Sequence, residues 1–296
     1  MSQTSLKGPL LVLAGSLCFS TSGFLQAIAP GEATPYIVAG CRMLIGAIAL
    51  FLFCIISGKT LNLRNWPVKS LLLYALALWA YQITFFNSLL FVGVAVGTVV
   101  SIGVTPIASG IMSTILEKKA PPRAWYPATL LAVIGLILMN SVEGAPLDPF
   151  GLALSVFAGI CYAVELTIAK PLTEHHTAEE SMMVVMFLVG LGLLPFFFFY
   201  PVSWVLTAKG LAVTTGLGVI TAACAFSLLV KGLKTTPPAI ASTLTLAEPM
   251  GAALLGIFAL GEACSTKTAI GIALIMASIL VLVVLQGKQR SESNHP

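Results

Sequence analysis

The sequence predicts an all-α integral membrane protein, with ten transmembrane helices arranged as a 5+5 inverted-topology repeat. Three observations lead to this prediction: an apolar composition, apolar runs of membrane-spanning length, and an internal similarity at constant spacing. Of the 296 residues, 58% are hydrophobic and only 9% are charged, whereas a soluble domain carries about 25% charged residues. The composition therefore excludes a water-soluble enzyme, a nucleic-acid binder and a disordered scaffold. The net charge of +4 is too small to indicate a polyanionic partner.

Ten apolar runs are each close to the length of about 20 residues that a helix needs to cross about 30 Å of hydrocarbon. They lie at 9–29, 35–57, 70–91, 95–116, 124–141, 150–169, 182–201, 210–230, 238–260 and 267–286. The first run is longer than the apolar core of about 7–15 residues of a signal peptide, so we expect it to remain as a helix. The connections are short, so consecutive helices are expected to be antiparallel neighbours.

Basic residues are distributed unevenly between the two sets of connections. If the N-terminus is cytoplasmic, the cytoplasmic set is Lys7, Lys59, Arg64, Lys69, Lys118, Lys119, Arg123, Lys170, Lys231, Lys234, Lys288 and Arg290. The outer set is then only Lys209 and Lys267. Cytoplasmic loops are rich in Lys and Arg, so the sequence predicts a multi-pass protein of the cell (inner) membrane with both termini in the cytoplasm.

The two halves of the chain align at a spacing of 143 residues. The matching positions are Gly8 with Gly151, Leu17-Cys18-Phe19 with Ile160-Cys161-Tyr162, and Thr105-Pro106 with Glu248-Pro249. We therefore predict a first repeat over 1–145, a second over 146–290 and a polar tail over 291–296. Each half holds five spans, so the second half enters the bilayer upside down. Inverted repeats commonly build transporters around a midplane site, although a duplication can also simply make a stable bundle.

Three short stretches of the second half carry a resemblance to a known family. They are Leu246-Ala247-Glu248-Pro249-Met250, Gly261-Glu262 and Gly271-Ile272-Ala273-Leu274-Ile275, with a looser version from Thr105-Pro106 to Leu116-Glu117. Together with ten spans and Arg42 early in the second, this pattern resembles the EamA family of the drug/metabolite transporter superfamily. The resemblance implies membrane transport through a central cavity lined by spans 1–4 and 6–9, with spans 5 and 10 to one side.

Glu248 is the strongest candidate for a functional residue. An ionisable group inside the bilayer costs about 2.5–3.5 kcal/mol on insertion scales, so its presence indicates a role. Pro249 deletes a helical hydrogen bond beside the acid, and Thr245 lies on the same small, polar helix face. We expect a matching broken helix around Thr105 and Pro106. The hypothesis is that Glu248 binds a substrate ammonium or exchanges a proton; the alternative is a structural acid bonded to neighbouring helices.

Arg42 and Glu165 are the other ionisable residues inside predicted spans. Arg42 suits bidentate binding of a substrate carboxylate, but a structural role is favoured, in which it extends to the outer interface or pairs with Glu32 or another acid. Glu165 is predicted near the cytoplasmic end of its span, as a gate, a solvated helix end or a partner of Lys170. A direct contact with the substrate is the less favoured alternative.

The third predicted span mixes polar and aromatic side chains. Trp79, Tyr81 and Gln82 are candidates for the cavity wall, because a mid-membrane polar group needs a partner. The alternative is helix packing with satisfied hydrogen bonds. In the first span, Ser20 lies on a small-residue stripe that either lines the same cavity or allows close helix packing. The two histidines and three acids of the connection after the sixth span are expected to be a solvated loop.

The leading interpretation is a secondary transporter of small organic metabolites, an exporter of amino acids or related solutes, with protons as a candidate coupling ion. No ATP-binding GxxxxGK[ST] loop is present, so any energy must come from a gradient or from the solute itself. The alternatives are multidrug efflux of lipophilic cations, a channel, and an intramembrane enzyme. The enzyme is disfavoured because the interior of the predicted spans contains no His or Lys for the usual catalytic sets of nucleophile and base. We expect no cofactor and no metal, and a monomer or weak homodimer in the lipid bilayer.

Overall fold

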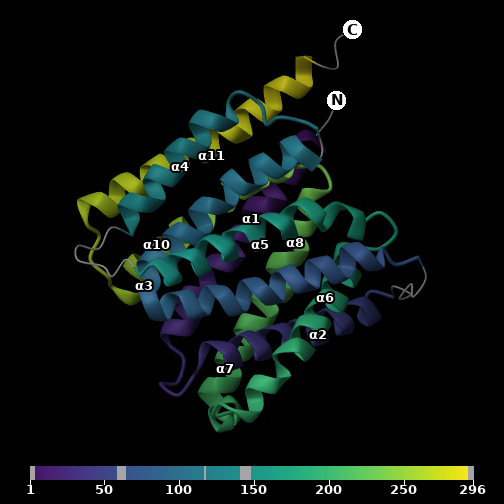
Figure 1. The fold of residues 1–296 in the computed structure, drawn as a ribbon, viewed down its shortest axis with the longest axis vertical. Helices are drawn as coiled ribbons and strands as arrows, with labels where there is room; N and C mark the ends of the chain where they lie inside the picture. Colours follow the sequence, from purple (N-terminus) through teal and green to yellow (C-terminus); the bar gives the residue numbers. More distant parts are fainter. Residues whose placement is uncertain (1–3, 59–64, 117, 141–147, 293–296) are drawn as a thin grey trace.

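The computed structural model describes residues 4–58, 65–116, 118–140 and 148–292, and within these ranges its regular elements are all helices (Figure 1). The elements of the first half are α1 (Thr4–Ala27), α2 (Pro35–Ile56), α3 (Val68–Leu116) and α4 (Trp125–Met139). Those of the second half are α5 (Pro149–Leu172), α6 (Ala178–Leu193), η1 (Leu194–Phe198), η2 (Ser203–Leu206), α7 (Ala208–Gly216), η3 (Leu217–Cys224), α8 (Ala225–Leu233), α9 (Pro238–Leu244), α10 (Ala247–Leu260) and α11 (Thr266–Glu292). Lys59, Arg64 and Glu117 lie outside the described residues.

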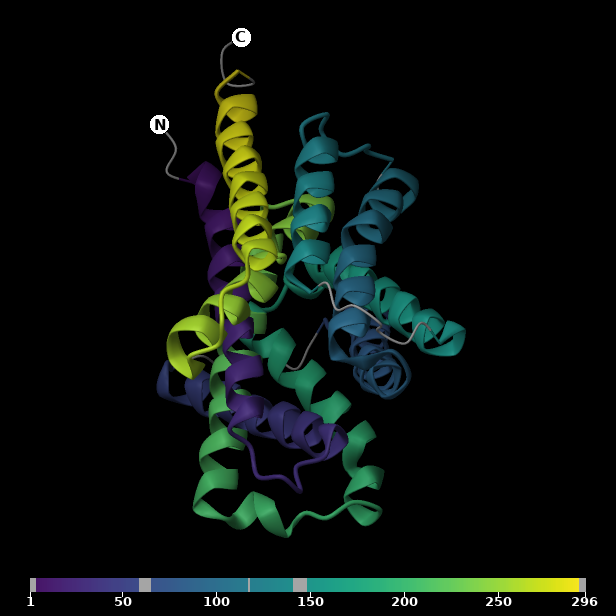
Figure 2. The same cartoon turned by 90° about the vertical axis from the view of Figure 1, so that its left-hand side faces the viewer.

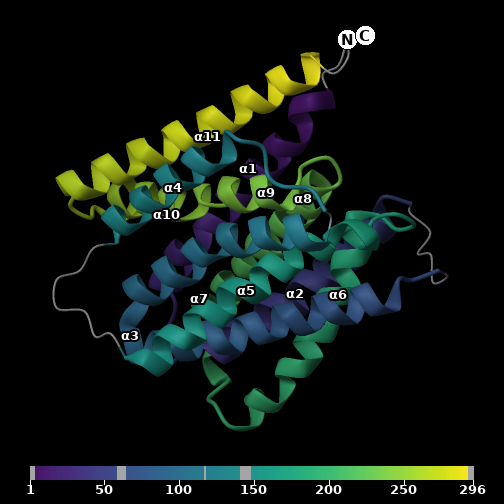
Figure 3. The same ribbon diagram turned by 45° about the horizontal axis from the view of Figure 1, so that its top comes forward.

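Within the described residues, eight helical segments are long and apolar enough to cross a membrane, and α4 is a shorter apolar helix of 15 residues. One of the eight is α3, whose 49 residues would extend about 74 Å at 1.5 Å per residue if straight. Gly93 interrupts it with a φ of 76° and a ψ of 166°, a conformation that glycine adopts without steric cost. The two segments fold back on one another there (Figures 1 and 3). The count of ten spans stays a prediction.

Three predicted spans are locally irregular, and all belong to the second half. The run predicted at 182–201 passes from α6 into the 3-10 helix η1. The run predicted at 210–230 divides into α7, the π-helix η3 and α8, and the run predicted at 238–260 divides into α9 and α10. The matching break expected around Pro106 is wrong: Pro106 lies inside the second segment of α3, where Gly93 is the non-helical residue. A proline removes one backbone donor, and here the helix continues past it.

The helices of the two halves pack mainly on each other. In the first half, α1 lies against α8 and α10, and α2 lies against α6 and η3; α5 lies along α3. In the repeat, α5 is the counterpart of α1, and the first segment of α3 is the counterpart of α8. The contact of α1 with α8 therefore corresponds to the contact of α5 with the first segment of α3. Glycines allow the close approach, since an added Cβ at Gly15 would lie 2.8 Å from the Ala225 carbonyl oxygen. The fold therefore has an internal exchange symmetry that matches the predicted repeat.

The pair α4 and α11 lies to one side of the molecule (Figures 2 and 3). The two helices meet at Gly135 and Gly271, where a Cβ added to Gly135 would lie 2.6 Å from the Gly271 carbonyl oxygen. This is the position that the family resemblance implies for the fifth and tenth predicted spans. The polar tail was predicted from residue 291, whereas α11 continues to Glu292.

The connection between α5 and α6 is more ordered than the solvated loop that the sequence predicted. Thr177 and Glu180 form a reciprocal capping box at the start of α6. Glu179 forms an ion pair with Lys231 at 2.6 Å. His176 is only 4% exposed, and its ring stacks on Trp66 at a centroid distance of 3.7 Å. The expectation of a solvated loop holds for the exposed Glu174 and His175. It is wrong for His176, Glu179 and Glu180, which are buried where the ends of the helices meet.

Candidate functional site

Arg42 points into the helix bundle, not toward the outer interface. Its Nη2 atom donates a 3.0 Å hydrogen bond to the carbonyl oxygen of Thr221 on η3. Its guanidinium lies 5.8 Å from the ring centroid of Phe19 and 5.9 Å from that of Phe226, within the range of cation–π attraction. The two rings meet edge to face at 4.8 Å. Pairing of Arg42 with Glu32, one of the predicted structural roles, is not seen within the described residues.

The acceptor for Arg42 comes from an unusual turn of the backbone. Thr221 lies in the π-helix η3, and π-turns are rare and frequently occur at functional sites because they displace backbone carbonyls from regular bonding. The Thr221 hydroxyl donates to the Leu217 carbonyl oxygen at 2.7 Å, so the side chain is bonded within its own helix. Arg42 thus connects α2 of the first half to the irregular part of the second half.

Glu248 lies in the first turn of α10, immediately after the break from α9. Its backbone N–H donates to the Thr245 carbonyl oxygen at 2.9 Å, the acceptor that Pro249 cannot use because proline has no N–H. The positive end of the helix dipole favours an acid at this position. The side chain is partly buried and makes no hydrogen bond or ion pair within the described residues. The carboxylate lies in electrostatic range of Arg42, Tyr81 and Tyr162.

Glu165 is a second acid in the same region. It is 0% exposed, and neither carboxylate oxygen has a hydrogen-bond partner. It lies in electrostatic range of Arg42 and of Tyr74, and the hydroxyl of Tyr74 is likewise buried without a partner. The predicted alternatives of a solvated helix end and of a pair with Lys170 are therefore wrong. A buried, unpartnered acid needs a proton, water or a ligand to offset the loss of hydration.

Two tyrosine rings lie in electrostatic range of both acids. Tyr81 of α3 lies 5.7 Å from Tyr162 of α5 and 5.4 Å from Phe85, measured between ring centroids. Tyr81 and Phe85 are partly buried, whereas Tyr162 is buried. The candidate site therefore combines one guanidinium, two carboxylates and a wall of rings, and it draws on both halves of the chain. Such a set suits a solute that carries a positive group and an apolar or aromatic part.

Three predicted site residues use their hydroxyl hydrogens on nearby backbone carbonyls. Ser20 donates to Leu17 at 2.6 Å and Thr245 donates to Ser242 at 2.8 Å. Thr105 is bonded to two carbonyl oxygens, those of Ser101 at 2.9 Å and Gly159 at 3.2 Å. The hydrogen bond to Gly159 joins α3 to α5, so the Thr105 hydroxyl contributes to helix packing.

The remaining predicted residues divide between packing and the site. Trp79 donates from Nε1 to the Gly192 carbonyl oxygen at 3.0 Å and so fastens α3 to α6. Gln82 is only 3% exposed and makes no hydrogen bond to another described residue, which leaves its amide available. Pro106 and Pro249 are both buried, the first in a continuous helix and the second beside the α9–α10 break.

The second half of the chain contributes more to the site than its sequence indicates. Tyr162 and Glu165 are three residues apart, which places them on one face of α5, and this spacing was the available signal. Thr221 could not be found in the same way, because the contribution comes from a backbone carbonyl in a π-helix. No group of three or more His, Cys, Asp or Glu side chains that could hold a metal occurs within the described residues.

Comparison with known proteins gives two matches to the same family model, described as the EamA-like transporter family, at residues 6–141 and 149–284. The matches start 143 residues apart and end 143 residues apart, which confirms the predicted internal repeat and its spacing. A similar protein is "Uncharacterized transporter YwfM" of Bacillus subtilis (strain 168), 35% identical over 283 residues, or 95% of each chain. "Protein PecM" of Dickeya dadantii (strain 3937) is 27% identical over 274 residues, 90% of this chain and 88% of that protein.

A solved crystal structure has a similar architecture. It matches this chain with a TM-score of 0.82 at 20% sequence identity, over 95% of this chain and 98% of that chain. At this identity the likeness concerns the fold alone.

Proposed function

The chain belongs to the EamA-like transporter family, within the drug/metabolite transporter superfamily, and from this premise we propose a secondary transporter of small organic metabolites. The solutes are amino acids or related compounds, the direction is export, and the cycle is alternating access. The observation that carries the proposal is the convergence of Arg42, Glu165 and Glu248 where the two halves of the chain meet. Three ionisable groups inside a multi-pass membrane protein are costly and mark a solute or ion pathway.

In this proposal each charged group has a separate task. Glu248 binds the substrate ammonium in one step and a proton in another, so proton and solute compete for one carboxylate. Arg42 holds its position through the Thr221 carbonyl and the two phenylalanine rings, and its Nε atom, buried without a partner, remains available for a substrate carboxylate. Gln82 and Tyr81 contact the neutral part of the solute.

The same proposal includes the topology. Counting the two segments of α3 separately and α4 as a span gives ten spans, five in each half, over 1–145 and 146–290. The even count puts both termini on one side, and the basic residues favour the cytoplasmic side of the cell membrane. The break between α9 and α10 supplies a mobile joint beside Glu248, as discontinuous helices do at transporter sites.

A panel of metabolites on proteoliposomes, with and without an imposed pH gradient, tests the function. We expect saturable accumulation of at least one amino acid or related solute, driven by the gradient in unmodified protein and lost in Glu248→Gln. Accumulation that is equal in both proteins would contradict the role of Glu248. Absence of gradient-driven transport for every solute in both would contradict coupling.

Efflux of lipophilic cations is a second candidate, and one observation favours it. Two carboxylates lie in electrostatic range of one guanidinium, so the ionised site has an excess negative charge near the rings of Phe19, Phe226, Tyr81 and Tyr162. Aromatic faces attract cations as well as apolar groups. Including a quaternary ammonium compound in the panel separates the candidates: a transported cation without a carboxylate excludes a required Arg42–carboxylate contact.

A further inference from the structure

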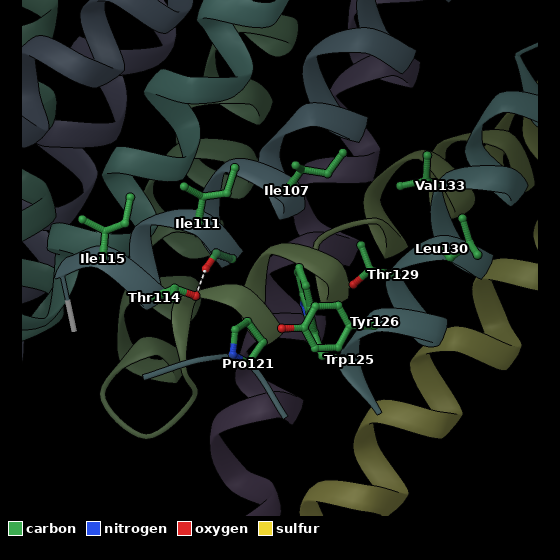
Figure 4. Close-up of a pocket in the computed structure, with 11 residues that line it drawn as sticks. Ile107, Ile111, Thr114, Ile115, Pro121, Trp125, Tyr126, Thr129, Leu130 and Val133 are labelled. Carbon is green, nitrogen blue, oxygen red and sulfur yellow. Dashed lines mark hydrogen bonds between the residues drawn. The ribbon is translucent and has the colours of Figure 1, made fainter. Parts of the chain in front are cut away.

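A cavity lies away from the charged site, between the second segment of α3 and α4 (Figure 4). Its volume is about 530 Å³, within the range of about 300–1,000 Å³ that is usual for small-molecule sites. The lining residues, which define the α3–α4 pocket, are Ile107, Gly110, Ile111, Thr114, Ile115, Pro121, Trp125, Tyr126, Thr129, Leu130 and Val133. Ile111, Ile115 and Leu130 are more than half exposed, so the pocket opens on the apolar outer surface of the protein.

The polar groups of the pocket wall are mostly bonded within the protein. The Trp125 Nε1 atom donates to the Ala239 carbonyl oxygen at 2.7 Å. The hydroxyls of Thr129 and Thr243 are 2.8 Å apart, and Thr114 donates to the Gly110 carbonyl oxygen at 2.8 Å (Figure 4). A solute that needs several hydrogen bonds would find few partners here. The wall instead suits a hydrocarbon chain, which gains from burial and needs no polar contact.

One end of the pocket is basic. Pro121 closes that end, in a connection that carries the exposed side chains of Lys118, Lys119 and Arg123. With Glu117 the sequence of this connection has a net charge of +2. Trp125 and Tyr126 lie at the same end, where aromatic side chains mark the level of lipid headgroups. Basic residues at such a level attract anionic headgroups.

We propose that the α3–α4 pocket binds an anionic phospholipid, with one acyl chain between the isoleucines of α3 and Leu130 of α4. The phosphate lies at the Pro121 end, where Lys118, Lys119 and Arg123 neutralise it. A soluble organic phosphate lacks the chain that fills the apolar wall, and a zwitterionic lipid lacks the net charge that the basic end selects. The lipid site does not depend on the proposed transport activity.

Native mass spectrometry of the full-length protein tests the site. The protein is extracted from membranes that contain equal amounts of phosphatidylglycerol and phosphatidylcholine, and the lipids that stay bound are counted. We expect preferential retention of phosphatidylglycerol. Removing three positive charges in K118Q/K119Q/R123Q should weaken it at least tenfold, since each basic residue near an anionic lipid is worth roughly a fivefold change in affinity.

Filling the pocket gives an independent variant with a matched control. Ile111→Trp places a large ring in the pocket from a residue that is 55% exposed. Ile48→Trp makes the same change at a residue that is 57% exposed and lines a smaller hollow of about 310 Å³ between α2 and α6. We expect loss of bound phosphatidylglycerol in the first variant and retention in the second.

Two results would overturn the lipid site. The first is equal retention of both lipids by unmodified protein, since the basic end would then select nothing. The second is unchanged retention of phosphatidylglycerol in Ile111→Trp, with size-exclusion chromatography showing that both tryptophan variants are folded. The charge variant alters only exposed side chains, so it remains informative if Ile111→Trp does not fold.

Discussion

The prolines at 106 and 249 occupy matching positions of the two repeats, yet their surroundings differ. Around Pro106 the helix α3 is continuous, and the preceding Thr105 bonds two backbone carbonyls, one of them on α5. Around Pro249 the chain breaks into α9 and α10, and the preceding Glu248 has no hydrogen-bonded side-chain partner within the described residues. At matching positions of the repeat, Thr105 therefore bonds to a neighbouring helix, whereas Glu248 has no such bond and can contact a ligand.

A proline alone therefore does not determine whether a helix is interrupted. Pro249 leaves the Thr245 carbonyl without its regular donor, and the Glu248 N–H takes that carbonyl at 2.9 Å in a tighter turn. At Pro106, the Thr105 side chain adds a hydrogen bond that connects the segment to α5. Neighbouring contacts therefore decide whether the helix is interrupted where a proline removes a hydrogen bond.

The largest expected effect is that of Glu248→Gln, which removes the acid that distinguishes the two segments. A charged hydrogen bond contributes about 1.5–3 kcal/mol, so affinity for a cationic solute should fall about 10- to 100-fold. Equilibrium binding of a transported solute to purified protein measures this loss. Glu262→Gln is the control, because it makes the same change at an exposed acid after the other end of α10. Equal losses in both variants would contradict a specific role for Glu248.

Arg42→Lys should have the next largest effect. Lysine keeps the charge but lacks the planar guanidinium that stacks on rings and donates several bonds. Loss of the bond to the Thr221 carbonyl should cost about 1.5–3 kcal/mol, seen as a lower thermal unfolding temperature of the purified protein. Arg123→Lys, at an exposed position, should leave that temperature unchanged. An unfolding temperature of Arg42→Lys equal to that of the unmodified protein would remove the structural role of this contact.

The paired variants Pro249→Ala and Pro106→Ala test whether the two prolines differ in their effect on transport. Alanine at 249 restores an N–H that competes for the Thr245 carbonyl and favours a continuous helix, so the rate of solute transport should fall several-fold. Alanine at 106 adds a bond to a helix that is already continuous, so transport should stay within about twofold, consistent with a net gain of only 0.5–1.5 kcal/mol per hydrogen bond. Equal transport rates in the two variants would show that the break is not a working joint.

Thr105→Val should have the smallest effect. It removes the hydroxyl that bonds to Ser101 and Gly159, and interhelical hydrogen bonds in membranes average about 0.6 kcal/mol. We expect a fall of a few degrees in the unfolding temperature with transport retained. Abolished transport in a well-folded Thr105→Val protein would place this residue in the solute pathway and contradict the division between the halves.

Much of the architecture could be predicted from the sequence, because it follows from apolar run lengths and from the repeat. The spacing of 143 residues agrees with the two matches to the family model. The first and second predicted spans correspond to α1 and α2, and the predicted fifth and tenth to α4 and α11. The limit was reached where neighbouring contacts override local patterns, as at Pro106, which the pattern alone assigns to a break.

The site was predicted only in part, for a physical reason. Arg42, Tyr81 and Glu248 stand out as polar side chains in apolar runs, and the structure brings them within electrostatic range of one another. Glu165 was misplaced because position along a span does not reveal which helices cover it. The Thr221 carbonyl carries no side-chain signal, because every residue has a carbonyl and only a π-turn makes this one available.

Solute-evoked proton movement reports whether solute and proton exchange at Glu248. A pH-sensitive dye trapped in proteoliposomes reports proton flux when a transported solute is added outside, in unmodified protein and in Glu248→Gln. We expect a saturable pH change for the unmodified protein and for Glu262→Gln, and none for Glu248→Gln. A pH change of equal size in Glu248→Gln would contradict the exchange of solute and proton at this carboxylate.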